Sequence, residues 1–469
     1  MPESTVDAPR SVWSDLREAI RGTGADYTKI PLPRAVFLLA VPMVLELVLE
    51  STFAVVDIYF VGKLGSSAVA TVGLTETILF LLYAIGMGLA MAVTAVVARR
   101  IGEGKRDEAA VTAVQALWIA LIVSVPFAIA GIVFAQDLLR LMGADAWTLE
   151  HGYPYMQWAL GGNTVILLLF TINAVFRGAG DAAAAMRVLW LANGLNIVLD
   201  PMLIFGFGPI PAFGIEGAAM ATTTGRGAGV LLQLWILFRG GRHLRVLRSQ
   251  ILWHGAILRN VVRTSFGGIG QMIVAMTAWI FLMRILAGIG GGAVAGATIA
   301  LRIMMFTMMP AWGMSNAAAT LVGQNLGAQQ SGRAEASVWR IGAYNMVYLL
   351  AVSVVYFALP RELMGIFTTD PAVIAVGAEW LRILSYSLFV YGWWMVSVQA
   401  FNGAGDTATP TWINLVFFWL IQIPLSWLLA VALGWQHSGV FWGVFLSETS
   451  VGLFTLWLFT RGRWKAAQV

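Results

Sequence analysis

The sequence contains no cysteine and few charged side chains, and both shortages narrow what the protein can be. Among its 469 residues there is no Cys, and only 11% are Asp, Glu, Lys or Arg. Without cysteine there is no disulfide, no thiol nucleophile and no thiolate metal site. Soluble domains carry roughly 25% charged residues, so an ordinary soluble fold is excluded.

The motifs of soluble enzymes are lacking as well. There is no Walker phosphate loop, which removes ATP as the direct energy source, and the four histidines do not have metal-site spacing. The Gly-Ala-Gly-Asp sequences at 178–181 and 403–406 look like phosphate loops, but they lie between hydrophobic runs and predict tight turns. We therefore expect a protein that is not an enzyme and has no cofactor.

What the sequence does have is a series of long apolar runs. Hydrophobic residues make up 59% of the chain. A membrane-spanning helix needs about 20 mostly apolar residues, whereas a membrane barrel would show short alternating segments. The runs fall at 35–61, 68–98, 110–135, 151–176, 186–208, 214–238, 261–287, 293–322, 336–359, 374–400, 409–434 and 438–460. The fold class predicted is all-α and integral to the membrane, with twelve transmembrane helices.

Positive charges gather in alternate connecting segments, which predicts the orientation. The outer loops hold only Lys63, Arg140 and Arg361, and most of the 29 Lys and Arg lie in the segments predicted to be cytoplasmic. These segments include a tail at 1–34, with an amphipathic helix around 12–20, and a tail at 461–469. Both termini are therefore expected on the cytoplasmic side of the cell membrane.

The chain repeats itself after 225 residues, because Gly88 aligns with Gly313 and the segment 176–181 aligns with 401–406. Six spans in each half make both halves enter the membrane in the same direction, as in a parallel repeat. Two such lobes can rock around a central cleft, which favours transport over a receptor or structural role. The predicted units are an N-terminal lobe at 35–238, a linker at 239–260 and a C-terminal lobe at 261–460.

Acidic residues inside the first and fifth spans are the strongest candidates for chemistry. At about 100° per residue, Glu46, Glu50 and Asp57 share one helix face, and so do Asn196 and Asp200. A carboxylate is costly in hydrocarbon and normally faces the bundle interior. It can ligate a small cation or hold a proton, and either event can bias a two-state lobe. We expect Asp57 and Asp200 to couple transport to a cation. Glu46 and Glu50 either line a route for cationic substrates or form hydrogen bonds within the bundle.

The second half lacks matching acids. Leu282 stands opposite Asp57, and Gln271 stands opposite Glu46. The coupling cation is therefore expected in the N-terminal lobe.

Other side chains within the spans have two interpretations each. Met304 and Met308 suit a site that accepts varied shapes, and Trp394 can stack on aromatic cations, but all three can equally serve packing. Arg226, Arg284 and Arg302 are expected to snorkel or to pair with backbone carbonyls, with the cleft as an alternative place for Arg302.

Several motifs resemble those of the multidrug and toxic compound extrusion (MATE) family. They are Val41-Pro42, Val56-Asp57 and Gly62-Lys-Leu-Gly65 in and after the first span, Arg-Gly-Ala-Gly-Asp at 177–181, Gly-Ala-Ala-Met-Ala-Thr at 217–222 and Val-Gly-Gln-Asn-Leu-Gly at 322–327. The resemblance extends from about 35 to 460. It implies a secondary antiporter that expels cationic or amphipathic molecules in exchange for Na⁺ or H⁺.

The DinF-like and archaeal branch of that family has its coupling site in the N-terminal lobe. Carried onto this chain, the site comprises Asp57, Asn196, Asp200 and Thr222, with Asn173 at its periphery and Na⁺ possible at the two aspartates. Another branch uses acids in the seventh and tenth spans. Here those spans hold Gln271 and, near the outer start, Glu379, so no cation site is expected in the C-terminal lobe.

The alternatives are a lipid-linked saccharide or lipid flippase of the same superfamily, a membrane-embedded enzyme and a channel. A flippase would need a large cationic cavity for pyrophosphate, and an enzyme would need a convergent nucleophile or metal set. The partners expected are small cationic or amphipathic molecules and membrane lipids, with no nucleic acid, and the protein is expected to be a monomer.

Overall fold

The computed structural model describes residues 11–241 and 243–467, and these residues form a bundle of long helices. Within those two ranges the only β-type contact is an isolated bridge between Phe207 and Ile210. Arg10 and Arg242, which belong to the segments predicted to be cytoplasmic, lie outside the described residues.

The first half of the chain forms the N-lobe, which comprises α2 to α8. Its helices are α2 (Leu32–Gly62), α3 (Ser66–Gly102), α4 (Arg106–Leu141), η1 (Thr148–Gly152), α5 (Tyr153–Gly161), α6 (Asn163–Ala179), α7 (Ala182–Phe205) and α8 (Ile215–Arg239). The segments η1, α5 and α6 follow one another as a single apolar stretch, Thr148–Ala179. The short helix α1 (Val12–Arg21) precedes this lobe, as the amphipathic pattern predicted.

The second half forms the C-lobe, which comprises α9 to α17, and a linker containing η2 (Arg248–Gln250) precedes it. Its helices are α9 (Gly255–Ile289), α10 (Gly291–Gly327), α11 (Ser331–Ala358), α12 (Pro360–Gly365), α13 (Pro371–Ser385), α14 (Leu388–Ala404), α15 (Ala408–Asn414), η3 (Leu415–Gln422), α16 (Ile423–Trp427), η4 (Leu428–Ala432) and α17 (Gln436–Thr460), followed by η5 (Arg463–Ala466). The segments from α15 to η4 again form one continuous apolar stretch, Ala408–Ala432.

The number of spans agrees with the prediction. Ten helical stretches among the described residues are long and apolar enough to cross a membrane, and α13 with α14 forms an eleventh span that is bent by 63°. The helix α8 is the twelfth span. It has 25 residues, but Glu216 and Arg226 within it lower its mean hydropathy. The all-helical membrane fold is confirmed.

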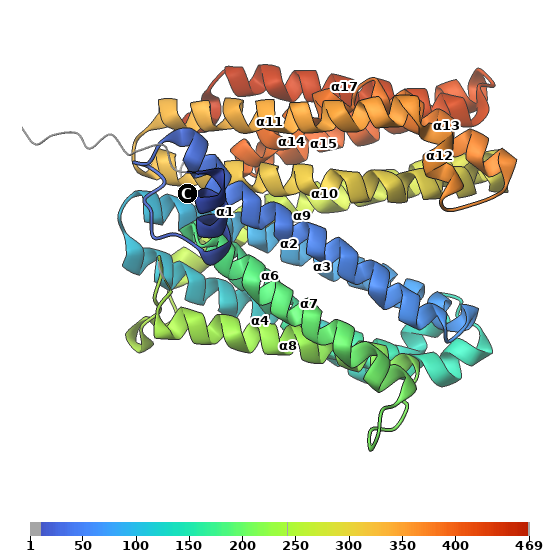
Figure 1. The fold of residues 1–469 in the computed structure, drawn as a ribbon, viewed down its shortest axis with the longest axis horizontal. Coiled ribbons are helices and arrows are strands. Elements are labelled where there is room, and N and C mark those ends of the chain that lie inside the picture. Colours follow the sequence, from blue (N-terminus) through green and yellow to red (C-terminus); the bar gives the residue numbers. More distant parts are fainter. Residues whose placement is uncertain (1–10, 242, 468–469) are drawn as a thin grey trace, which may run out of the picture.

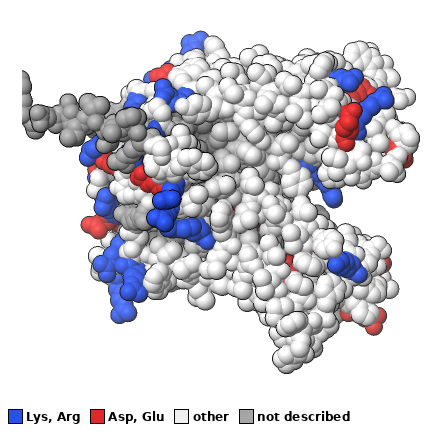
Figure 2. Space-filling model, in the orientation of Figure 1, with Lys and Arg blue, Asp and Glu red and all other residues white. Residues whose placement is uncertain are grey.

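The two lobes lie side by side and diverge toward one end of the molecule (Figure 1). They contact each other where α3 meets α9 and α10, and where α2 meets α10. The space-filling view shows a deep notch between the lobes at the end away from α1 and the C-terminus (Figure 2). The lobes therefore enclose a cleft that is open on one side and closed on the other.

Two glycines related by the repeat allow the lobes to meet. A Cβ atom on Gly313 of α10 would lie 2.6 Å from the Cα of Val44 in α2. A Cβ atom on Gly88 of α3 would overlap the backbone of Ile269 in α9. Because the backbone atoms themselves approach this closely, only glycine fits at either position. The repeat detected in the sequence thus marks the contact between the lobes.

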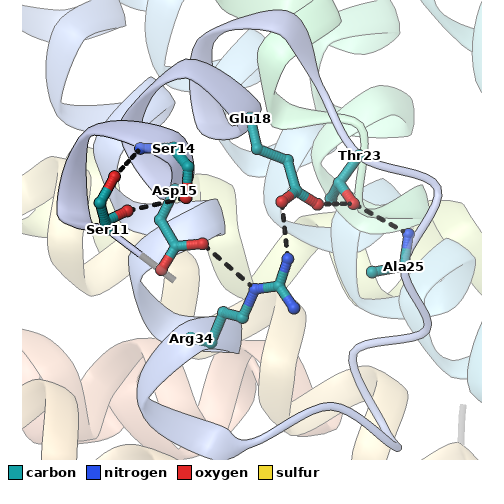
Figure 3. A network of polar contacts seen from close by, with 7 residues as sticks. All are labelled: Ser11, Ser14, Asp15, Glu18, Thr23, Ala25 and Arg34. Atoms are coloured by element: carbon teal, nitrogen blue, oxygen red, sulfur yellow. Dashed lines mark hydrogen bonds and ion pairs between the residues drawn. The ribbon is translucent and has the colours of Figure 1, made fainter. Parts of the chain in front are cut away.

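A short N-terminal segment, residues 11–31, covers the closed end. Arg34 of α2 holds α1 through two carboxylates, with its Nε 3.4 Å from Asp15 Oδ1 and its Nη2 2.6 Å from Glu18 Oε2 (Figure 3). Thr23 Oγ1 donates to the other Glu18 oxygen at 2.7 Å. The helix α1 is therefore fixed against the start of α2.

The same segment contacts both lobes. The Tyr27 hydroxyl donates to the carbonyl oxygen of Gly180, between α6 and α7, at 3.1 Å. From the other lobe, Arg333 Nη2 of α11 donates to the Tyr27 carbonyl oxygen at 2.9 Å. Burial raises the pKa of Tyr27, so its hydroxyl keeps the proton that it donates. Residues 11–31 consequently join the lobes at the end opposite the notch.

Candidate functional site

Two aspartates of the N-lobe have carboxylate oxygens without protein partners. Asp200, on α7, is 0% exposed, and within residues 11–241 and 243–467 neither of its oxygens accepts a hydrogen bond. Asp57, on the neighbouring helix α2, is half-buried, and its Oδ1 is also unpartnered there. The two carboxylates lie close enough to interact electrostatically. Burying an unpaired carboxylate costs free energy, so a bound positive partner would stabilise this pair.

Backbone chemistry adds to the polarity of this region. Pro201 follows Asp200 inside α7. Proline has no N–H, so it gives no hydrogen bond to the carbonyl oxygen of Ile197 one turn earlier. A carbonyl oxygen that lacks its usual helical donor therefore lies one turn before Asp200.

Asn196 and Thr222 connect this region to α8. The Asn196 side chain is 1% exposed, and its Nδ2 donates to Thr222 Oγ1 at 3.0 Å. The amide oxygen of Asn196 is left without a donor. Gly225 lets the helices approach, since a Cβ there would lie 2.8 Å from the Ala192 carbonyl oxygen. Oxygen atoms from Asp57, Asp200 and Asn196 are thus free, and oxygen ligands suit a hard cation such as Na⁺.

Glu50 has partners, in contrast to the two aspartates. Arg226 Nη2 of α8 lies 3.1 Å from Glu50 Oε1, and Asn193 Nδ2 of α7 donates to Glu50 Oε2 at 2.9 Å. The expectation that Arg226 snorkels or binds a backbone carbonyl is wrong, because it is 9% exposed and pairs with Glu50. The sequence could not show this pair, whose members are 176 residues apart.

Glu46 belongs to a second polar network. Asn173 Nδ2 of α6 donates to Glu46 Oε1 at 3.4 Å, and Arg177 Nη1 lies 3.8 Å from the same oxygen. Asn173 Oδ1 in turn accepts from Gln233 Nε2 at 2.7 Å. At about 1.5 Å per residue, Glu46 lies roughly 16 Å along α2 from Asp57. Asn173 therefore lies with Glu46 and away from Asp57, although the family resemblance placed it at the periphery of the Asp57 site.

The predicted substrate-path residues of the C-lobe lie in packed surroundings. Met308 is 3% exposed, and both it and the half-buried Met304 belong to the apolar core of that lobe. The Trp394 ring lies 4.6 Å from Tyr391 and 6.0 Å from Phe418, measured between ring centroids. Glu46, Glu50, Met304, Met308 and Trp394 stay predictions as a substrate route.

Arg302 is directed to the other lobe. It is exposed on α10, and it interacts electrostatically with Glu76, an exposed residue of α3 in the N-lobe. A partner on the opposite lobe places Arg302 at the cleft, the alternative that the sequence left open. Arg284 is also exposed.

The Glu50–Arg226 pair leads to a stability prediction. Glu50→Gln leaves the buried Arg226 without its ion-pair partner. Breaking a buried pair costs about 3–5 kcal/mol, and because the Glu50 side chain is 31% exposed we expect a loss of roughly 2 kcal/mol in the free energy of unfolding. Thermal denaturation of the purified protein in detergent measures it.

Two further variants control that prediction. The double variant Glu50→Gln/Arg226→Met removes both charges and is expected to recover most of the lost stability. Glu335→Gln breaks the pair with Lys465, and it should change the stability little, because the Lys465 side chain is 32% exposed and that of Arg226 only 10%. Equal losses for Glu50→Gln and Glu335→Gln would contradict the prediction.

One acidic residue was missed in the sequence. Glu448 lies within the twelfth apolar run, on α17. An acid in the middle of an apolar run was a sufficient signal to single it out.

Comparison with known proteins identifies similar chains. A family model described as MatE matches residues 42–202 and again 268–428, once in each half. A protein described as "FAD transporter" from Shewanella oneidensis is 26% identical over 87% of this chain and 90% of its own length. A "Probable multidrug resistance protein NorM" from Thermotoga maritima is 26% identical over 92% of this chain and 93% of its own length.

Solved structures are similar as well. One is described as the outward-facing conformation of a multidrug resistance MATE family transporter of the MOP superfamily. It superimposes with a TM-score of 0.87 at 25% identity, covering 95% of this chain and 99% of that one.

Proposed function

Since the chain belongs to the MatE family of membrane transporters, we propose that it is a secondary active multidrug efflux transporter that exchanges small cationic or amphipathic molecules for H⁺ or Na⁺. It carries out transport and not an enzymatic reaction. The observation that carries the proposal is Asp200, a fully buried carboxylate without a protein partner on either oxygen in the described chain. A travelling cation supplies the missing partner.

The arrangement of the lobes supports alternating access. Binding of one cation by Asp57 and Asp200 changes the charge inside the N-lobe by one unit. A ligand that binds two conformations with different affinities shifts their populations. Release of the cation on one side and binding on the other then bias the lobes toward opposite openings.

The sidedness follows from the distribution of positive charge. Lys and Arg gather at the end where α1 and the C-terminus lie, away from the notch (Figure 2). Under the positive-inside rule that end is cytoplasmic. The notch then opens to the outside of the cell membrane, the state from which a substrate leaves.

The alternative within the same superfamily is export of a phosphorylated substrate, such as a lipid-linked saccharide. The relative described as an FAD transporter carries a phosphorylated molecule. Such a substrate needs a cationic cavity. Asp57 and Asp200 make the N-lobe interior acidic instead, which favours a cationic substrate.

Transport by purified protein in liposomes tests the proposal. A fluorescent organic cation, ethidium, should move against its gradient when a Na⁺ gradient or a pH gradient is imposed separately, and one of the two gradients should suffice. Transport driven by neither gradient would refute coupled antiport. Resistance of cells that lack their own pumps distinguishes drug efflux from export of a lipid-linked saccharide.

A further inference from the structure

Glu448 lies near the middle of α17 and points into the C-lobe. Leu446 and Leu453, which are 44% and 56% exposed, mark the outer face of this helix. At about 100° per residue, Glu448 lies roughly 140–160° around the helix from both. Val444 and Val451, on the same side as Glu448, are 0% exposed. The carboxylate is therefore directed toward the neighbouring helices and away from the lipid.

No protein group neutralises this carboxylate. In the part of the chain that the structure describes, Glu448 has neither a hydrogen bond nor an ion pair, whereas Glu46 and Glu50 each have an arginine. A charged group at mid-membrane depth normally pairs with another group or marks a ligand pathway. Since Glu448 is not paired with another protein group, it is a candidate for binding a ligand.

Aromatic rings lie on the side of α17 that carries Glu448. Tyr391 of α14 lies close enough to Glu448 to interact electrostatically. Its ring lies 4.6 Å from that of Trp394, and Phe418 of η3 meets Trp394 edge-on at 6.0 Å. Gly452, one turn after Glu448, packs closely against α14, because a Cβ there would lie 2.9 Å from Val390 Cγ1 and 3.7 Å from the Trp394 Cβ. The indole N–H of Trp394 is buried without an acceptor.

We propose that Glu448, Tyr391, Trp394 and Phe418 form a binding site for a lipophilic organic cation within the C-lobe. The carboxylate supplies the counter-charge, and the ring faces attract a cation that has lost its water. A metal ion would need several oxygen or nitrogen ligands, and within the described residues Glu448 belongs to no group of three or more His, Asp or Glu that could hold one. This proposal rests on the proposed function. It joins Trp394, which the sequence suggested for stacking on aromatic cations, to Glu448, an acid that the sequence analysis did not single out.

Equilibrium binding of tetraphenylphosphonium to the purified full-length protein, without any ion gradient, tests the site. Glu448→Gln should weaken binding about tenfold, and Trp394→Leu should weaken it by a similar factor. The matched control is Glu379→Gln in the same lobe, because Glu379 has protein partners in Ser438 and His437. The control should bind as the unmodified protein does.

Unchanged affinity in Glu448→Gln overturns the proposal. So does unchanged affinity accompanied by an altered pH dependence of transport, which would make Glu448 a proton site. If Glu448→Gln does not fold, Trp394→Leu, which retains the acid, gives the same comparison. Asp57→Asn separates the two proposals: it should lose driven transport but bind tetraphenylphosphonium normally. Transport that survives Asp57→Asn refutes the coupling site and leaves the Glu448 site standing.

Discussion

Replacing Asp200 by asparagine is expected to reduce gradient-driven efflux to the level of protein-free liposomes. Asparagine keeps the shape of the side chain but cannot carry the negative charge that a cation neutralises. Asp200 is completely buried, so bulk water does not take over the role of its lost charge. Asp57→Asn should have the same effect because its carboxylate interacts with that of Asp200. Efflux of ethidium from liposomes under an imposed Na⁺ or pH gradient is the measurement.

The same change is expected to raise stability while it removes activity. A buried carboxylate without a partner is costly in the absence of a bound cation, so Asp200→Asn should increase the midpoint of thermal unfolding in detergent. Asp137→Asn is the matched control, since Asp137 is 66% exposed and pairs with Arg140 at the surface. It should alter neither property. Normal pumping by both Asp57→Asn and Asp200→Asn would show that the coupling site lies elsewhere.

Gly313→Leu and Gly88→Leu are expected to stop transport by forcing the lobes apart at their contact. The added side chain of either variant would overlap backbone atoms of the opposite lobe, at Val44 or Ile269. Overpacking typically costs about 1–3 kcal/mol, which shifts the balance between the two openings by roughly 5- to 150-fold. The population of the conformation in which the lobes are closed at the end near α1 and the C-terminus should decrease, and efflux should fall with it.

The absence of cysteine makes that shift measurable. Thr320→Cys introduces a single thiol on α10 at a side chain that is 0% exposed and donates to the Arg177 carbonyl oxygen of the N-lobe at 3.1 Å. A polar maleimide should label this cysteine slowly in the otherwise unmodified protein and faster with Gly313→Leu. Gly73→Leu, at a position of α3 with open space around it, should change neither labelling nor transport. Equal labelling in all variants would contradict the role of the glycines.

The fold could be predicted because few backbone structures are stable in the hydrocarbon region of a membrane. Every backbone polar group must be satisfied within its own helix, so run length alone indicated the spans. The helix α8 is the instructive case. It was predicted at 214–238 and is found at Ile215–Arg239, although Arg226 makes it the least apolar of the spans. The repeat still indicated that α8 is a span, because α17 occupies the equivalent position in the C-lobe.

The candidate site was only partly predictable. Helix periodicity placed Asn196 and Asp200 on one face, and the structure brings Asn196 to Thr222 as the family resemblance implied. Periodicity also placed Glu50 and Asp57 on one face, but it could not tell which of them forms an ion pair. Arg226, from another helix, pairs with Glu50 and acts on Asp57 only electrostatically.

The sequence by itself determined the membrane, the number of helices, the duplication and the helix faces that carry acids, because these depend on local composition and on periods of a few residues. Only the tertiary structure decided which acids are paired. Arg177 and Arg226 approach Glu46 and Glu50, whereas Asp200 and Glu448 have no such partner in the described chain. Pairing depends on side chains from distant helices meeting within a few ångströms, and no local pattern encodes that distance. If experiment found a bound arginine or lysine at the Asp57 and Asp200 carboxylates, the coupled mechanism proposed for this protein would fail.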